Sequence, residues 1–239
     1  MISSLDEISL VSYFQFKRFC LAQSESVMKV STDSRILGSF ISNYEYNAVL
    51  DIGCGMGILS FMLSDKRPEA RIVGIDSIQE CIFLAQHSKS LRNQFEGIQF
   101  IHKDLYYYQP DNLFDLIISN PPYFLNQLKS HSDSRNQMRH TNTNFVDMFC
   151  YFSKKYLTGD GSIAIVLPYA LESQWTFNMC KYGFILNELV EIKHDKKSDT
   201  SLVICVYRKK FDKLIIKNLI LFESKDKVSI EFKELIDSF

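Results

Sequence analysis

The chain has 239 residues, of which 46% are hydrophobic and 23% charged, and its formal net charge is −1. This composition fits one globular domain with a sizeable core and excludes a disordered chain. No apolar run is long enough to cross a membrane, the first ten residues do not resemble a secretory signal, and the net charge does not by itself indicate a nucleic-acid-binding protein.

Short apolar runs alternate with helical patterns from residue 47 onward. Strands are predicted at 47–53, 70–76, 98–104, 114–120 and 161–168, and helices at 57–67, 78–92 and 144–157. Strands that alternate with helices are typical of a mostly parallel sheet with helices on both faces. The strand runs are almost continuously apolar, as expected when both faces of the sheet are covered.

The end of the chain has a different pattern. Residues 184–194 and 200–210 predict two strands joined by a short polar turn, so that an antiparallel hairpin would close one edge of a seven-stranded sheet. A further strand is predicted at 213–222 and a last helix from about Ser229. We therefore expect a single domain, 1–239, with an N-terminal segment (1–44), a core (45–210), and a C-terminal strand and helix (211–239).

A glycine-rich turn, DIGCGMG (51–57), ends the first strand and opens the first helix. Gly53, Gly55 and Gly57 permit a tight turn and a close approach of a ligand to the backbone. The N–H groups at the start of the helix can then face a polar or anionic group. Some turns of this kind serve only packing, so the motif needs support from its surroundings.

Acidic residues supply that support, because they follow the next two strands. Asp76 ends the second strand, where a carboxylate can accept hydrogen bonds from two ribose hydroxyls. Asp104 ends the third, where an acid could accept the exocyclic amine of an adenine. Acids at such positions also cap helices. Together with Asp51 they favour a ligand site, because open α/β sheets bind ligands at the carboxyl ends of their strands.

The motif NPPYF follows the fourth strand. The side-chain oxygen of Asn120 and the carbonyl of Pro121 could each accept one hydrogen of a planar amine, so that its lone pair would point at a methyl donor. Tyr123 offers a ring on which a base can stack, and Pro122 stiffens the turn. Catalysis would then consist of orientation and electrostatics. The alternative is a strand-ending turn with buried aromatic residues.

Four segments together resemble the class I S-adenosylmethionine-dependent methyltransferases: VLDIGCGMG, VGID with Asp76, HKD with Asp104, and NPPYF. The resemblance implies a Rossmann-like fold and S-adenosylmethionine as the cofactor, with no metal. The cofactor-binding residues that it implies are Asp51, Gly53, Gly55, Asp76, Asp104 and Asn120, and the catalytic residues are Asn120, Pro121, Pro122 and Tyr123.

Methyltransferases with an NPPY-like motif act on DNA adenine N6, rRNA guanine N2, protein glutamine N5 or tRNA adenine N6. The chain has no room for a DNA-recognition domain, no N-terminal helical bundle and no duplicated domain. Its segment 16–40 closely resembles the start of the bacterial tRNA(Val) adenine-37 N6-methyltransferases. In that family a K-V-x-T-D element, matched here by Lys29, Val30, Thr32 and Asp33, helps to close over the cofactor.

The resemblance therefore implies methyl transfer to N6 of adenosine 37 in the anticodon loop of tRNA(Val), by a cytoplasmic monomer with no membrane partner. The other three targets stay open as alternatives.

An RNA partner has modest support from the residues themselves. Basic residues gather late in the chain, and Lys17 and Arg18 alternate with aromatic residues near its start. The late group comprises Lys193, Lys196, Lys197, Arg208, Lys209, Lys210, Lys213 and Lys217.

The polar segment 125–143 is long enough to be functional. We expect Tyr123 and Phe124 to contact the substrate base, and Arg135 and Arg139 to bind flanking phosphates. Solvated surface lysines and a solvated loop are the alternatives.

Overall fold

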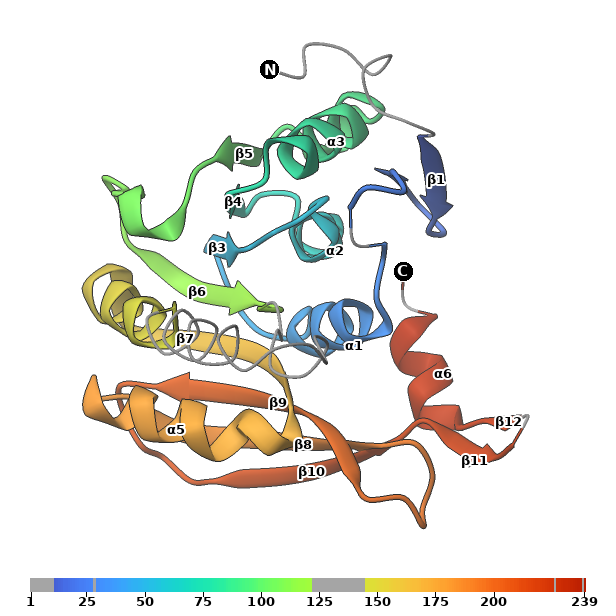
Figure 1. The fold of residues 1–239 in the computed structure, drawn as a ribbon, viewed down its shortest axis with the longest axis vertical. Helices are drawn as coiled ribbons and strands as arrows, with labels where there is room; N and C mark the ends of the chain where they lie inside the picture. Colours follow the sequence, from blue (N-terminus) through green and yellow to red (C-terminus); the bar gives the residue numbers. More distant parts are fainter. Residues whose placement is uncertain (1–10, 28, 122–144, 226, 238) are drawn as a thin grey trace, which may run out of the picture.

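A central eight-stranded sheet organises the molecule in the order β10-β8-β9-β7-β6-β3-β4-β5 (Figure 1). The structure is a computed structural model that describes residues 11–27, 29–121, 145–225, 227–237 and 239. Five strands run parallel to one another: β3 (Ala48–Ile52), β4 (Arg71–Asp76), β5 (Ile98–His102), β6 (Phe114–Ser119) and β7 (Leu157–Pro168). The helices are α1 (Thr32–Ile41), α2 (Ile58–Lys66), α3 (Gln79–Ser90) and α5 (Glu172–Lys181), and residues 145–156 are also helical.

The far edge of the sheet differs from the prediction. Strand β9 (Thr200–Arg208) lies between β7 and β8 (Ile185–Lys193) and runs antiparallel to both. The predicted hairpin therefore exists, but it does not form the edge. Strand β10 (Ile215–Ile220) pairs in parallel with β8 and becomes the eighth strand. The predicted count of seven was one short because a parallel partner of β8 needs a crossover that no local pattern reveals.

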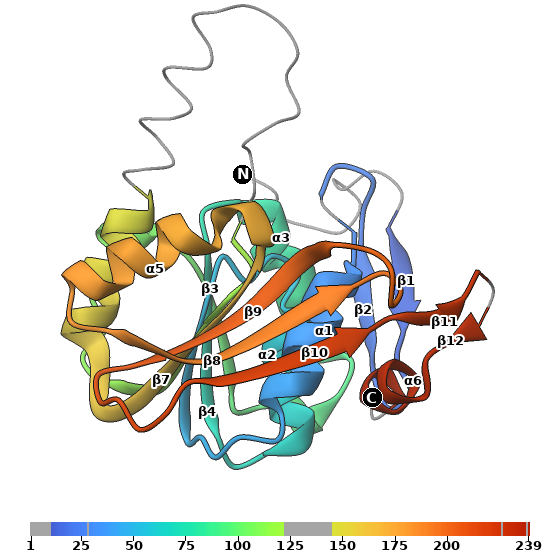
Figure 2. The ribbon, with the colours of Figure 1, turned by 90° about the horizontal axis from the view of Figure 1, so that it is seen from below.

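Helices cover both faces of the sheet, as predicted. On one face, α1, α2 and α3 pack against the sheet; on the other, α5 and the helix at 145–156 do so. Figure 2 shows α5 and α1 on opposite sides of the sheet. Two large hydrophobic clusters, one on each face, contain most of the buried apolar side chains, so the fold buries the apolar runs that the sequence pattern predicts.

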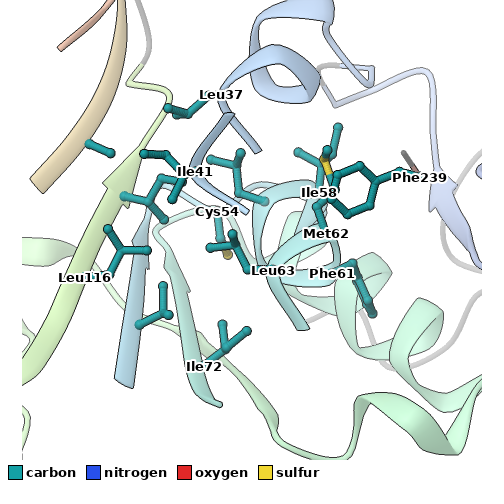
Figure 3. Close-up of a cluster of buried hydrophobic side chains, with 14 of the residues drawn as sticks. Leu37, Ile41, Cys54, Ile58, Phe61, Met62, Leu63, Ile72, Leu116 and Phe239 are labelled. Carbon is teal, nitrogen blue, oxygen red and sulfur yellow. The ribbon is translucent and has the colours of Figure 1, made fainter. Parts of the chain in front are cut away.

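Helix α1 is held tightly against α2. Leu37 and Ile41 of α1 are fully buried beside Met62 and Leu63 of α2 (Figure 3). A Cβ added at Gly38 would lie 2.7 Å from the sulfur of Met62, so the Met62 side chain packs directly against the backbone of α1. This packing fixes where the N-terminal segment meets the rest of the fold.

The chain before α1 forms an antiparallel hairpin of β1 (Ser12–Gln15) and β2 (Cys20–Gln23). Phe16 and Phe19 are buried and stack with their ring centroids 4.5 Å apart. Arg18 forms an ion pair with Asp65 at 2.5 Å, and Lys17 donates a hydrogen bond to a backbone carbonyl. The aromatic residues of this alternation therefore belong to a packed junction, whereas Lys17 and Arg18 are exposed, and their contact with RNA stays a prediction.

The C-terminal elements are β11 (Phe222–Ser224), β12 (Lys227–Val228) and α6 (Ile230–Ile236). The hydroxyl of Ser229 caps α6 by accepting the N–H of Phe232 at 3.0 Å, which confirms the predicted start of the last helix. In the part of the chain that the structure describes, no helix is both long and apolar enough to cross a membrane.

Candidate functional site

The carboxyl ends of β3, β4, β5 and β6 lie next to one another on the carboxyl-terminal side of the parallel strands. The strand order β6-β3-β4-β5 makes them neighbours, and the register places Asp51 beside Ile118 and Asp76 beside His102. The predicted glycine turn and Asp76 therefore lie at the same end of the strands as Asn120, which directly follows β6.

The glycine turn has a backbone conformation that favours glycine. Gly53, Gly55 and Gly57 have φ values of 68°, 54° and 86°, all in the left-handed region. The N–H groups of Gly53 and Cys54 both donate to the carbonyl of Ile75, at 2.9 and 3.0 Å, which ties the turn to β4. Within the described residues, no atom lies within 4 Å of a Cβ built on Gly53 or Gly55. A ligand can therefore approach the backbone there.

Asp76 holds this turn in place. One carboxylate oxygen accepts the N–H of Gly55 at 2.8 Å, and the other accepts the N–H of Ile78 at 2.8 Å. A carboxylate has about four lone-pair sites, so two amide bonds leave acceptor capacity for further donors. The half-buried side chain can thus fix the turn and still bind two ligand hydroxyls.

Asp51 is fully buried beneath the turn. Its Oδ2 accepts the hydroxyl of Ser60 at 2.7 Å and the N–H of Ser60 at 3.2 Å. Its Oδ1 has no hydrogen-bond partner among the described residues. Burial raises the pKa of Asp51 to about 7; the bonds from Ser60 oppose this rise and the charge of Asp76 adds to it. Because this oxygen is itself buried, the carboxylate can act on a ligand at the turn only through its charge.

Asp104 has the capping role that was the alternative to ligand binding. It is exposed, and its Oδ1 accepts the N–H of Tyr106 at 2.8 Å at the start of a 3-10 turn, Leu105–Tyr107. A contact between Asp104 and an adenine amine stays a prediction.

The side chain of Asn120 faces the start of α1. Its Nδ2 donates to the hydroxyl of Ser34 at 2.8 Å and to that of Ser31 at 3.4 Å. The next residue, Pro121, is buried. Sequence reasoning did not single out the two serines, although Ser31 directly before a helical pattern is a recognisable N-cap signal.

The other predicted residues of the N-terminal element lie at the start of α1. Lys29 and Thr32 are exposed. Asp33 is half-buried, and its burial raises the pKa of its carboxyl. Their contacts with a cofactor stay predictions. Five further predicted residues lie outside the described residues: Pro122, Tyr123, Phe124, Arg135 and Arg139.

The late basic residues do not form one surface. Lys193 is the last residue of β8. The turn that carries Lys196 and Lys197 therefore lies at the end of the sheet where β7 also ends. Arg208 is the last residue of β9 and lies at the opposite end of these strands, beside Ser162. There Lys209 donates to the carbonyl of Leu157 at 2.6 Å.

Two more of these lysines form ion pairs with carboxylates. Lys210 pairs with Asp160 at 2.6 Å, and Lys217 pairs with Glu188 at 2.6 Å. The clustering of basic residues in the sequence therefore does not become one basic patch in the fold.

The sequence model of the methyltransferase small domain matches residues 26–188, well over half of the chain. The chain belongs to this family. A curated relative from Photorhabdus laumondii, the tRNA1(Val) (adenine(37)-N6)-methyltransferase, is 27% identical over 229 residues, which cover 95% of this chain and 94% of the relative.

Two solved structures share the fold. A "predicted O-methyltransferase" from Agrobacterium tumefaciens has a TM-score of 0.66 at 15% identity, covering 86% of this chain and 96% of its own. A TehB-like SAM-dependent methyltransferase from Corynebacterium glutamicum has a TM-score of 0.52 at 17% identity, covering 77% and 91%. The fold is that of the class I methyltransferases, as predicted.

S-adenosylmethionine is the cofactor of this methyltransferase family, and the site is suited to it. The open backbone at Gly53 and Gly55 admits a ligand, and Asp76 offers acceptors for ribose hydroxyls. The protein is therefore an S-adenosylmethionine-dependent methyltransferase.

Proposed function

We propose that the protein transfers the methyl group to the exocyclic N6 of adenosine 37 in the anticodon loop of tRNA(Val). The observation that carries the proposal is the contact between Asn120 and the first turn of α1. It joins the beginning of the NPPY motif to the K-V-x-T-D element, the two features by which the chain resembles enzymes with this activity. The name of the Photorhabdus laumondii relative supports the same substrate.

Asn120 and Pro121 orient the target amine. S-adenosylmethionine supplies an electrophilic methyl group on a sulfonium. An exocyclic amine is a weak nucleophile because its lone pair is delocalised into the base. In our proposal Asn120 Oδ1 and the carbonyl of Pro121 accept its two hydrogens, which directs the lone pair toward the methyl group. The surplus proton then leaves to water, so no strong base is needed.

Several residues would bind the cofactor. Asp76 would accept the ribose hydroxyls while it keeps its bonds to the turn, and Asp51 would attract the ammonium group. Asp104 would accept the adenine amine with the oxygen that does not cap the 3-10 turn. Lys29 and Thr32 would close over the cofactor from the start of α1.

Tyr123 and Phe124 would contact the target base, and Arg135 and Arg139 would bind the phosphates that flank it. We place this activity in the cytoplasm, where tRNA is available, and propose that the protein acts as a monomer. Light scattering of the purified protein checks the oligomeric state.

The competing targets are rRNA guanine N2, DNA adenine N6 and protein glutamine N5, which also present planar amines. To separate them, the protein is incubated with methyl-labelled S-adenosylmethionine and with total tRNA, rRNA, DNA or a glutamine-rich protein. We expect label in tRNA as N6-methyladenosine and, in the Asn120→Ala variant, turnover lower by on the order of a hundredfold. Preferential labelling of another acceptor would refute the proposed substrate.

A further inference from the structure

The hydroxyls of Ser31 and Ser34 form a short hydrogen-bonded chain that ends on Asn120. Ser31 caps α1, because its Oγ accepts the N–H of Ser34 at 3.2 Å. The hydroxyl of Ser31 in turn donates to Ser34 Oγ at 3.2 Å. Ser34 Oγ then accepts a hydrogen from Asn120 Nδ2 at 2.8 Å, and Ser34 is buried. The orientation of the Asn120 amide is therefore linked to the cap of α1.

This chain favours one of the two orientations that a side-chain amide can adopt. With Nδ2 toward α1, its two hydrogens have two acceptors, Ser34 Oγ at 2.8 Å and Ser31 Oγ at 3.4 Å. With Oδ1 toward α1, only the hydrogen of Ser34 could reach it, because the hydrogen of Ser31 is directed to Ser34. Counted over these contacts with α1 alone, the difference is about one hydrogen bond, which is a preference of roughly fivefold.

We propose that Ser34, supported by Ser31, is a positioning residue that holds Asn120 Oδ1 on the substrate side. The inference rests on the proposed function, because it gives that oxygen the task of accepting the target amine. An oxygen in this place attracts an N–H donor, whereas the rotated amide would present its own N–H groups to the amine and repel it. Ser34 therefore favours amine targets without touching them.

Ser34 is well placed to act on catalysis alone. Helix α1 is anchored to α2 by buried residues such as Leu37, so the hydroxyl has a fixed position. In the sheet, β3 separates β6, which precedes Asn120, from β4, which carries Asp76. Loss of the Ser34 hydroxyl should therefore alter the orientation of the amine and leave cofactor binding unchanged.

The test compares Ser34→Ala with Ser39→Ala. Ser39 lies on the same helix, is buried, and its hydroxyl makes no hydrogen bond within the described part of the chain, so it is a matched control. We expect Ser34→Ala to lower kcat roughly twofold, because the fraction of Asn120 amides in the productive orientation falls from about five-sixths to about one half, with the KM for tRNA and the Kd for S-adenosylmethionine unchanged. Ser39→Ala should keep the wild-type kcat, and Ser34→Thr, which retains the hydroxyl, should recover it.

Three results would overturn the inference: a wild-type kcat for Ser34→Ala, an equal fall for Ser39→Ala, or a fall explained by lost folded fraction or lost cofactor affinity. A folded Ser34→Thr variant as slow as Ser34→Ala would do the same. Nucleoside analysis of the wild-type product is run in parallel. If the wild type methylates a different planar amine, the proposed function fails, and the same variants test the positioning role on that amine.

A second measurement needs no substrate. The protein is labelled with 15N-asparagine, and the side-chain NH2 signals of Asn120 are assigned by their absence in Asn120→Ala. We expect these hydrogens to exchange with water more rapidly in Ser34→Ala than in wild type or Ser39→Ala. Equal exchange in all three proteins would overturn the inference even if no methyl acceptor were found.

Discussion

Replacing Asp51 by Asn should make the protein more stable at high pH. The amide oxygen can keep both bonds from Ser60, and the NH2 group takes the place of the oxygen that has no partner among the described residues. The variant thus removes a buried charge at nearly constant shape. It should also bind S-adenosylmethionine more weakly, because a neutral amide does not attract its ammonium group.

The size of the effect follows from the pKa of Asp51. Burial raises this pKa from 3.8 to about 7, so the folded state binds more protons than the unfolded state between these values. The free energy of unfolding therefore falls as pH rises through this range, by about 1.4 kcal/mol per tenfold change in proton concentration. Between pH 5 and pH 8, Asp51→Asn should gain about 3 kcal/mol relative to wild type.

Urea unfolding of both proteins at pH 5, 6, 7 and 8 measures this difference. At pH 5 the wild-type carboxyl is protonated, so the variant gains nothing from the lost charge and should be the less stable protein, since an unpaired buried polar group costs about 1–3 kcal/mol. At pH 8 the variant should be the more stable protein. Parallel curves of unfolding free energy against pH would refute the idea that Asp51 is protonated on folding.

Three further predictions concern the cofactor, the turn and the RNA. Asp76→Ala should weaken S-adenosylmethionine at least tenfold in calorimetry without unfolding the protein, because each charge-assisted bond contributes roughly 1.5–3 kcal/mol; wild-type affinity would remove Asp76 from the site. Gly57→Ala should cost at least about 1 kcal/mol in urea unfolding, because φ is 86° and the added Cβ would lie 2.6 Å from the ring of Phe100; unchanged stability would contradict this packing. Joint replacement of Arg135 and Arg139 by Ala should weaken tRNA binding and lower its salt-dependence slope by roughly one per lost phosphate contact; superimposable salt titrations would show that neither arginine binds RNA.

Local patterns were enough to predict the half of the sheet that carries the site. The glycine turn and Asp76 could be predicted because a turn and the strand ends beside it are set by neighbouring residues. Strand β10 could be recognised as a strand, but its parallel pairing with β8 could not, because that contact joins distant segments. The same limit explains why the sheet was predicted with seven strands.

Side-chain contacts between segments far apart in the chain could not be predicted from the sequence either. Asn120 and Ser34 are 86 residues apart, and their contact depends on how α1 crosses α2. The late lysines look like one cluster in the sequence. Because β8 and β9 run in opposite directions, Lys197 lies at one end of these strands and Lys209 at the other. Asp104 could serve as a cap or a ligand-binding residue, and the fold shows the cap.

The most direct test of the proposed activity is methyl transfer to two tRNA(Val) transcripts that differ only at position 37. One carries adenosine and the other guanosine, and both are incubated with methyl-labelled S-adenosylmethionine and then digested to nucleosides. We predict N6-methyladenosine from the first transcript and no label in the second. Label in both transcripts, or a labelled nucleoside other than N6-methyladenosine, would contradict transfer to N6 of adenosine 37.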